Sequence, residues 1–239
     1  MPDNSPEVFT SVQGEGPKSG MLSLFVRLSE CNLYCRWCDT PYTWRWDSAR
    51  EHEDDKVYSR SQWQVKMSAR ELADEVRARG VKRVIFTGGE PLLQHRALLV
   101  VMKSLRETSE HYEFEFETNG TVAPPQEFLD LCSLIVVSPK LSNSGVEERA
   151  RIVPALAAVL RAPQTVLKFV VESDEDFEEI RDLQARFGVP SNRIWIMGQG
   201  RTAEAIARTG QAVIERVIAS GYNYTARLHL SLFGDKQGT

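Results

Sequence analysis

Residues 22–40 read LSLFVRLSECNLYCRWCDT, an apolar stretch that passes directly into a cysteine-rich loop. The first seven residues, 22–28, are mostly leucine, valine and phenylalanine and predict a strand. The loop that follows carries Cys31, Cys35 and Cys38 in the spacing C-x3-C-x2-C. A strand that ends in a polar, potentially functional loop is the unit from which we expect the fold to be built.

The same unit recurs along the chain. Further strands are predicted at 83–86, 114–117, 134–137, 166–171 and 193–197. Amphipathic helices are predicted at 69–80, 95–107, 147–160, 174–188 and 203–221, and Pro154 should kink or shorten the fourth of them. Strands separated by helices indicate βαβ units and a parallel sheet. Because six strands are too few for a closed eight-fold barrel, we expect an α/β fold with an open, partial, TIM-like β/α barrel.

A polar motif follows nearly every predicted strand. The motifs are SECNLYCRWCDT (29–40), TGGEP (87–91), ETNG (117–120), SPK (138–140) and MGQG (197–200). The carboxyl ends of parallel strands meet at one end of such a barrel, which is its catalytic face. We therefore expect these motifs to form one site.

Composition limits the class of protein. The 239 residues, 42% hydrophobic and 26% charged, fit a single globular domain spanning 1–239, with an irregular, tryptophan-rich insertion at about 41–67. A net charge of −4 argues against a general nucleic-acid binder. No apolar run approaches the roughly 20 residues that span a bilayer. The N-terminal segment lacks the basic start and apolar core of a signal peptide, so we expect a cytoplasmic protein without membrane partners.

The cysteine loop is better explained by an iron–sulfur cluster than by zinc or a disulfide. Structural zinc commonly takes four protein ligands, and the four histidines show no zinc-ligand spacing. A disulfide is disfavoured in a reducing cytoplasm. A [4Fe–4S] cluster takes four ligands, so three thiolates would leave one iron open to a small molecule. Cys132, among the apolar residues of FLDLCSLIVV, is expected to be an inert core thiol.

Other polar residues are candidates for ligand contacts, although turn chemistry explains several equally well. Gly88 and Gly89 would let the backbone approach a ligand closely. Gln13 and Glu15 in the segment QGEG offer donors and acceptors that suit a pterin or guanine edge. Arg27 lies within an apolar strand, where an arginine is expected to be paired, and a substrate carboxylate would match its planar fork.

The cysteine loop, with an aromatic residue before its last cysteine, resembles the motif of the radical S-adenosylmethionine (SAM) superfamily at every position. The combination of EVFTSVQGEG, LFVRLSECNLYCRWCDT, VIFTGGEPLLQ, ETNGT, VVSPK and RLHLSLFGDKQGT is similar to the 7-carboxy-7-deazaguanine synthase family. The resemblance runs from about residue 7 to the C-terminus and is weakest at 41–67. It implies a carbon–nitrogen lyase of the queuosine and 7-deazapurine pathway. The implied reaction converts 6-carboxy-5,6,7,8-tetrahydropterin to 7-carboxy-7-deazaguanine with release of ammonia.

The resemblance also implies the site residues, with the radical carried by SAM rather than by a catalytic side chain. The cluster ligands would be Cys31, Cys35 and Cys38, and Thr40 would bind Mg²⁺. SAM would contact Trp37, Cys38, Asp39, Gly89, Glu90, Ser138, Pro139, Lys140 and Gln199. The pterin would contact Val12, Gln13, Gly14, Glu15, Arg27, Thr87 and His229.

The implied partners are a second copy of the chain in a homodimer and an electron donor such as flavodoxin or ferredoxin. Two alternative functions remain. A glycyl-radical-enzyme activase shares the cluster loop and the GGEP segment, but it would lack the QGEG segment and act on a protein backbone. A non-enzymatic zinc-binding module belongs to a different class, and the single cysteine cluster disfavours it by ligand count.

Overall fold

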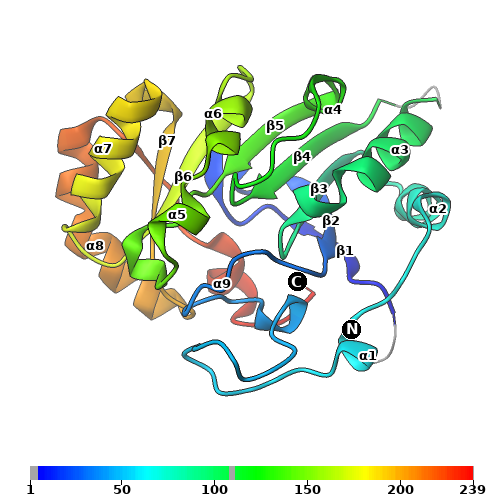
Figure 1. Ribbon diagram of the computed structural model, residues 1–239, viewed down its shortest axis with the longest axis horizontal. Helices are drawn as coiled ribbons and strands as arrows, with labels where there is room; N and C mark the ends of the chain where they lie inside the picture. The colour runs from blue at the N-terminus through cyan, green and yellow to red at the C-terminus, as the bar shows by residue number, and fades with distance from the viewer. Residues whose placement is uncertain (1–4, 108–110, 239) are drawn as a thin grey trace.

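The computed structural model of the protein describes residues 5–107 and 111–238 and has a curved, eight-stranded sheet at its centre (Figure 1). The strands, in sheet order, are β1 (Val8–Val12), β2 (Leu22–Leu28), β3 (Arg83–Gly88), β4 (Glu113–Thr118), β5 (Cys132–Val137), β6 (Thr165–Val171), β7 (Ile194–Gly198) and β8 (Asn223–Tyr224). β1 pairs antiparallel with β2, and every later pair is parallel. β1 and β8 form the two edges, so the barrel is open, which confirms the predicted fold class.

All six predicted strands are present, and their bounds differ from the predicted ones by at most two residues. The two strands that were not predicted are those at the edges. β1 precedes the QGEG segment, which the sequence presents as a glycine-rich turn, and β8 has only two residues, too few for any periodicity to be visible.

Helices occupy all five predicted amphipathic segments, and three short helices, at 60–63, 126–131 and 228–233, were not predicted. They are α1 (Arg60–Trp63), α2 (Ala69–Arg79), α3 (His95–Arg106), α4 (Gln126–Leu131), α5 (Glu148–Arg151), α6 (Pro154–Leu160), α7 (Asp176–Phe187), α8 (Ala203–Ser220) and α9 (Leu228–Phe233). The predicted helix at 147–160 is divided into α5 and α6, because a proline disrupts a helix interior but is favoured in its first turn. Within the described residues, no helix is both long enough and apolar enough to cross a lipid bilayer.

The alternation of side chains along the strands separates the core from the site. Phe86 on β3 and Phe116 on β4 stack at 4.9 Å between ring centroids and pack towards the helices that cover the outside of the sheet (Figure 1). Phe116 also meets Phe128 of α4 at 4.8 Å. Since successive residues of a strand point to opposite faces, Glu115 and Glu117 of β4 point into the barrel. The inner face of the sheet is therefore polar and charged here, whereas the outer face is apolar.

The segment 41–67 is largely irregular, as predicted, and it folds back over the cysteine loop. The His52 ring lies 2.9 Å, through Nε2, from the carbonyl oxygen of Cys38. The Gln64 amide donates to the Glu30 carboxylate at 2.8 Å. The rings of Tyr42, Tyr58 and Trp63 form a cluster. The centroid of Trp63 lies 5.1 Å from each of the other two, and those two lie 6.1 Å apart. The insertion thus forms one wall above the strand ends.

Candidate active site

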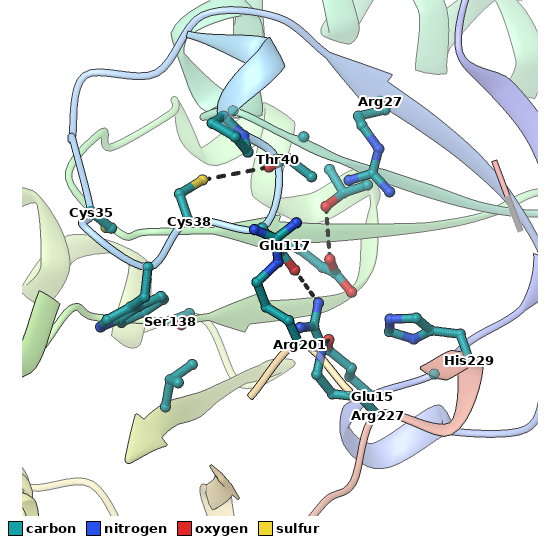
Figure 2. A pocket seen from close by; sticks show the side chains of 18 of the residues that line it. Glu15, Arg27, Cys35, Cys38, Thr40, Glu117, Ser138, Arg201, Arg227 and His229 are labelled. Carbon is teal, nitrogen blue, oxygen red and sulfur yellow. Dashed lines mark hydrogen bonds and ion pairs between the residues drawn. The ribbon is translucent and has the colours of Figure 1, made fainter. Parts of the chain in front are cut away.

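A cavity of about 410 Å³ opens at the carboxyl ends of the strands. Its lining comes from the loops after β2, β3, β4, β5 and β7, from the QGEG segment and from the C-terminal segment. Figure 2 shows Cys35 and Cys38 on one side of this cavity and the Glu15–Arg227 pair and His229 on another. All predicted site residues line the cavity except Glu90 and Pro139. The structure therefore brings together the motifs that the strand-end argument predicted to meet.

The three cysteines of the loop face the same cavity, and their thiols fit a metal cluster. Burial, with the neighbouring thiols adding to it, raises the pKa of Cys31 and Cys35 to about 12, and burial raises that of Cys38 as well. In the absence of a metal these thiols stay protonated near pH 7, as does Cys132 in the core, and they would lose their protons only on binding one. In the part of the chain that the structure describes, no three side chains of His, Cys, Asp or Glu converge as ligands of a single ion. Three cysteines on one loop that face a common cavity fit the ligand set of an iron–sulfur cluster, whereas structural zinc commonly takes four protein ligands.

Cys38 also receives a hydrogen bond from the insertion. The indole Nε1 of Trp44 donates to Cys38 Sγ at 3.3 Å, and the Thr40 hydroxyl lies 3.7 Å from the same sulfur. Hydrogen bonds to the sulfurs are among the factors that set the potential of an iron–sulfur cluster. The fourth cysteine, Cys132, donates to the carbonyl oxygen of Phe128 in the core and does not line the cavity. Its predicted role as a core thiol is confirmed.

The TGGEP loop is fastened to the start of the cysteine loop by its backbone. The N–H groups of Gly89 and Glu90 donate to the carbonyl oxygens of Leu28 and Glu30, both at 2.8 Å. A Cβ atom at position 89 would lie 2.1 Å from the Glu30 carbonyl oxygen, and Gly88 has a φ of 113°. The glycines are thus needed for close approach of two chain segments, in addition to any approach to a ligand.

The side chain of Glu90, a predicted SAM contact, is turned away from the cavity. Glu90 is fully buried and does not line the cavity. Its carboxylate accepts from the Thr118 hydroxyl at 2.7 Å, the Asn119 N–H at 2.7 Å and the Leu92 N–H at 2.9 Å. Glu90 therefore joins the loops after β3 and β4. Pro139 does not line the cavity either, although its neighbours Ser138 and Lys140 both do.

The residues predicted for SAM otherwise lie around one part of the cavity. The Lys140 ammonium donates to the Ser138 hydroxyl at 3.0 Å and lies 5.5 Å from the centre of the Trp37 ring. The Trp37 indole donates to the carbonyl oxygen of Asn143 at 3.1 Å, which fixes its plane. Gln199 lines the cavity from the loop after β7.

Glu15 lies at the centre of a buried charge network. One carboxylate oxygen accepts from Arg227 Nε at 2.9 Å, and the other forms an ion pair with Lys168. Arg227 also pairs with Asp39 and donates to the Gly200 carbonyl oxygen at 3.2 Å. Burial alone would raise the pKa of Glu15, but the two cations outweigh it and hold that pKa well below its usual range. Glu15 is therefore a permanently ionised acceptor in this cavity.

Gln13 is oriented by two carboxylates inside the barrel. Its amide nitrogen donates to Glu117 at 3.0 Å and to Glu115 at 3.3 Å, and its oxygen accepts from the Glu15 N–H at 3.2 Å. The Thr87 hydroxyl donates to Glu117 at 2.7 Å. The predicted substrate-binding residues Gln13 and Thr87 are thus held in place by β4, and Glu117 itself lines the cavity.

Arg27 and His229 complete the site from opposite ends of the chain. Arg27 Nε donates to Glu7 at 3.0 Å, and its guanidinium lines the cavity. His229 packs so closely on Gly14 that a Cβ atom there would lie 2.0 Å from its Nδ1. Burial lowers the pKa of His229, so the neutral imidazole is the form that faces the cavity near pH 7.

Sequence reasoning missed several residues that line this cavity, among them Trp44, Glu117, Lys168 and Arg227. Lys168 carries the signal that singled out Arg27, a charged residue within an apolar strand, VLKFVV. Arg227 precedes the motif histidine by two residues, but its partners are 212 and 188 positions away, beyond the reach of any local pattern.

The comparisons with known proteins agree with this geometry. The Radical SAM superfamily model matches residues 26–184. The 7-carboxy-7-deazaguanine synthase of Pyrobaculum aerophilum is 33% identical over 97% of this chain and 95% of the relative, and that of Rhodopirellula baltica is 31% identical over 98% and 87%. The crystal structure of QueE from Escherichia coli superposes with a TM-score of 0.66 at 25% identity, over 94% of this chain and 93% of that one. The chain belongs to the radical SAM superfamily and, within it, to the 7-carboxy-7-deazaguanine synthase family.

Proposed function

We propose that the protein converts 6-carboxy-5,6,7,8-tetrahydropterin to 7-carboxy-7-deazaguanine and ammonia. The observation that carries the proposal is a single cavity in which the loop of Cys31, Cys35 and Cys38 faces Arg27 and the ionised Glu15. Membership of the family supplies the reaction class, and the two charged groups match a substrate with a carboxylate and a row of ring N–H donors.

The cysteines would hold a [4Fe–4S] cluster, and Trp37, Asp39, Gly89 and the Ser138–Lys140 segment would surround SAM. Together the cluster and SAM would supply the radical chemistry of the reaction when bound. The part of the protein is to exclude water and to hold the reacting atoms together. Positioning of this kind contributes about 7–11 kcal/mol towards a barrier.

The residues facing the pterin have distinct tasks in this proposal. Arg27 would bind the carboxylate, since its planar fork suits two parallel hydrogen bonds. Glu15 would accept N–H groups from the ring, and it remains an anion because Lys168 and Arg227 surround it. The neutral His229 would lie against the ring from the C-terminal segment.

Mg²⁺ would be bound at Thr40, whose hydroxyl lines the cavity beside Cys38. Because no set of three acidic, thiol or imidazole side chains within the described residues could hold an ion, the remaining ligands would be substrate oxygens and water. We further propose that the protein works in the cytoplasm as a homodimer and takes its electron from a flavodoxin or ferredoxin.

The test is an anaerobic turnover assay with cluster-loaded protein, SAM, a chemical reductant and the carboxy-tetrahydropterin, with and without Mg²⁺. We expect 7-carboxy-7-deazaguanine and ammonia in equal amounts, and a fall in rate when Mg²⁺ is chelated. SAM cleavage to 5′-deoxyadenosine without 7-carboxy-7-deazaguanine would instead support the activase. Anaerobic reconstitution that yields bound zinc and no iron–sulfur absorbance would support the binding module.

A further inference from the structure

Glu7, just before β1, connects four parts of the chain beside the cavity. Its side chain is only 7% exposed. One carboxylate oxygen accepts from Arg27 Nε at 3.0 Å and from the Tyr42 hydroxyl at 3.2 Å, and the other accepts from the Gln237 amide at 3.4 Å. The backbone carbonyl oxygen of Glu7 also accepts the Arg27 N–H at 3.0 Å. Glu7 therefore holds both the backbone and the side chain of Arg27.

The position of the Glu7 contact decides which edge of the guanidinium remains available. Nε of Arg27 is occupied, whereas the two terminal nitrogens have no hydrogen-bond partner among residues 5–107 and 111–238. The ring of Phe9 supports the guanidinium from one side, with its centre 5.9 Å from the Arg27 Cζ. Figure 2 shows the Arg27 side chain directed into the cavity. With Nε occupied, the edge formed by the two terminal nitrogens is the one left to pair bidentately with a carboxylate.

The electrostatics of the pair agree with this geometry. Burial works to lower the pKa of Arg27, but the negative and polar groups around it, Tyr42 and Glu7 first, raise it instead. Arg27 therefore stays charged in a partly buried place, and Glu7 is the carboxylate in direct contact with it. A guanidinium held by one carboxylate and packed on a ring has fewer orientations than one that is free in solvent.

We propose that Glu7 is a positioning residue for carboxylate recognition: by occupying Nε, it aims the terminal nitrogens of Arg27 at the carboxylate of a planar heterocyclic ligand. This inference rests on the proposed function, because it takes the ligand of Arg27 to be the substrate carboxylate. Glu7 makes the site selective for carboxylated over uncarboxylated ring systems. It touches no reacting atom.

The test compares two ligands that differ only in the carboxylate. Binding of 7-carboxy-7-deazaguanine and of 7-deazaguanine is measured by calorimetry on anaerobic, cluster-loaded protein with SAM present. For Glu7→Ala we expect affinity for the carboxylated ligand to fall by about tenfold or more, and affinity for 7-deazaguanine to change by less than about twofold. Glu7→Gln, which keeps an acceptor for Nε without the charge, should lie between wild type and Glu7→Ala.

Two further variants complete the design. Glu113→Ala removes a carboxylate that pairs with Lys18 and Arg83 on the same face of the sheet but does not line the cavity, and it should change neither affinity. Arg27→Met should lose the preference for the carboxylated ligand, as Glu7→Ala does. The double variant should lose little more of it than either single variant, because both changes remove the same interaction. Glu7→Gln keeps the test valid if the alanine variant does not fold.

The outcomes separate the inference from the function on which it rests. If Glu7→Ala and Glu7→Gln weaken both ligands by the same factor, or neither ligand, Glu7 does not act in carboxylate recognition and the inference is overturned. If the wild-type protein binds neither ligand, or binds 7-deazaguanine as tightly as its carboxylated form, then Arg27 does not bind a substrate carboxylate as the proposed function requires. The inference about Glu7 then fails with it.

Discussion

Replacing Glu115 with glutamine is expected to stabilise the protein at alkaline pH and to have little effect in mild acid. Glu115 points into the barrel below Glu117, is 1% exposed, and has one oxygen, Oε2, without a hydrogen-bond partner among the described residues. Burial, and then the neighbouring Glu117, raise its pKa to about 7. Glutamine keeps an oxygen to accept from the Gln13 amide and cannot ionise.

The size and sign of the effect follow from linkage. An unfolded glutamate titrates near 4.5, so between that pH and about 7 the unfolded chain has lost a proton that the folded protein retains. The free energy of unfolding therefore falls as pH rises through this window, and the loss is complete above pH 7. At about 1.4 kcal/mol per pH unit, the loss amounts to about 3 kcal/mol.

The assay is thermal unfolding of anaerobic, cluster-loaded protein followed by circular dichroism at about pH 5 and about pH 8. For a chain of this length, about 3 kcal/mol corresponds to about 6–12 °C in Tm. The difference in Tm between Glu115→Gln and wild type should be larger at the higher pH by up to that amount. Glu127→Gln, at an exposed helical carboxylate, serves as the control and should show no such pH dependence.

A difference in Tm that is equal at both pH values would refute the reasoning, whatever its sign. A direct check uses infrared spectroscopy. Wild-type protein near neutral pH should show a protonated-carboxyl band that Glu115→Gln lacks, and this difference should disappear as the pH rises past about 7. If the band is missing from wild type at pH 6, Glu115 is ionised and the argument fails.

Three other changes test the site. Trp44→Phe removes the N–H···S bond to Cys38 and should lower the reduction potential of the cluster on the order of tens of millivolts, measured by anaerobic redox titration. Trp46→Phe is the control and should leave the potential unchanged, because the indole N–H of Trp46 has no partner among the described residues. Cys35→Ser should lower iron content and abolish SAM cleavage, whereas Cys132→Ser should leave both intact; equal iron content in the two variants would contradict the assignment. Arg227→Met leaves the largely buried Glu15 and the partly exposed Asp39 without their guanidinium, so it should lower stability and raise KM for the pterin. Arg227→Lys should restore only part of both because it lacks the planar fork, and an unchanged KM in both variants would count against a role for Arg227.

The sequence predicts the framework of this protein well because the signals of a β/α barrel are local. Apolar runs of strand length, amphipathic segments and glycine or proline at helix ends are each decided within about a dozen residues, and parallel pairing then places the loops together. Arg27 could be singled out in the same way, because an arginine in an apolar strand needs a partner. Lys168 offers the same signal, and applying the rule to every strand would have found it.

The roles of Glu90 and Arg227 could not be found this way, since their partners are distant in sequence. Glu90 follows two glycines in a loop that faces the cavity, yet hydrogen bonds from Thr118 and Asn119 turn its carboxylate into the protein. Arg227 joins Asp39 to Glu15 across 188 and 212 positions. Only tertiary structure decides whether a polar side chain in a strand-end loop faces the ligand or supports a neighbouring loop.

Several of the charges that line the cavity are paired with one another in the protein itself. Lys168, Glu15, Arg227 and Asp39 form one continuous chain of ion pairs, and Arg27 has Glu7. Taking charges out of water costs free energy that such pairs only partly offset, so the network is a weak explanation of stability. Its effect is orientation, because each charge is held in one place with one edge left to face the cavity. A ligand that enters therefore meets donors and acceptors that are already aligned, and little reorganisation of the site is needed before the reacting atoms are in place.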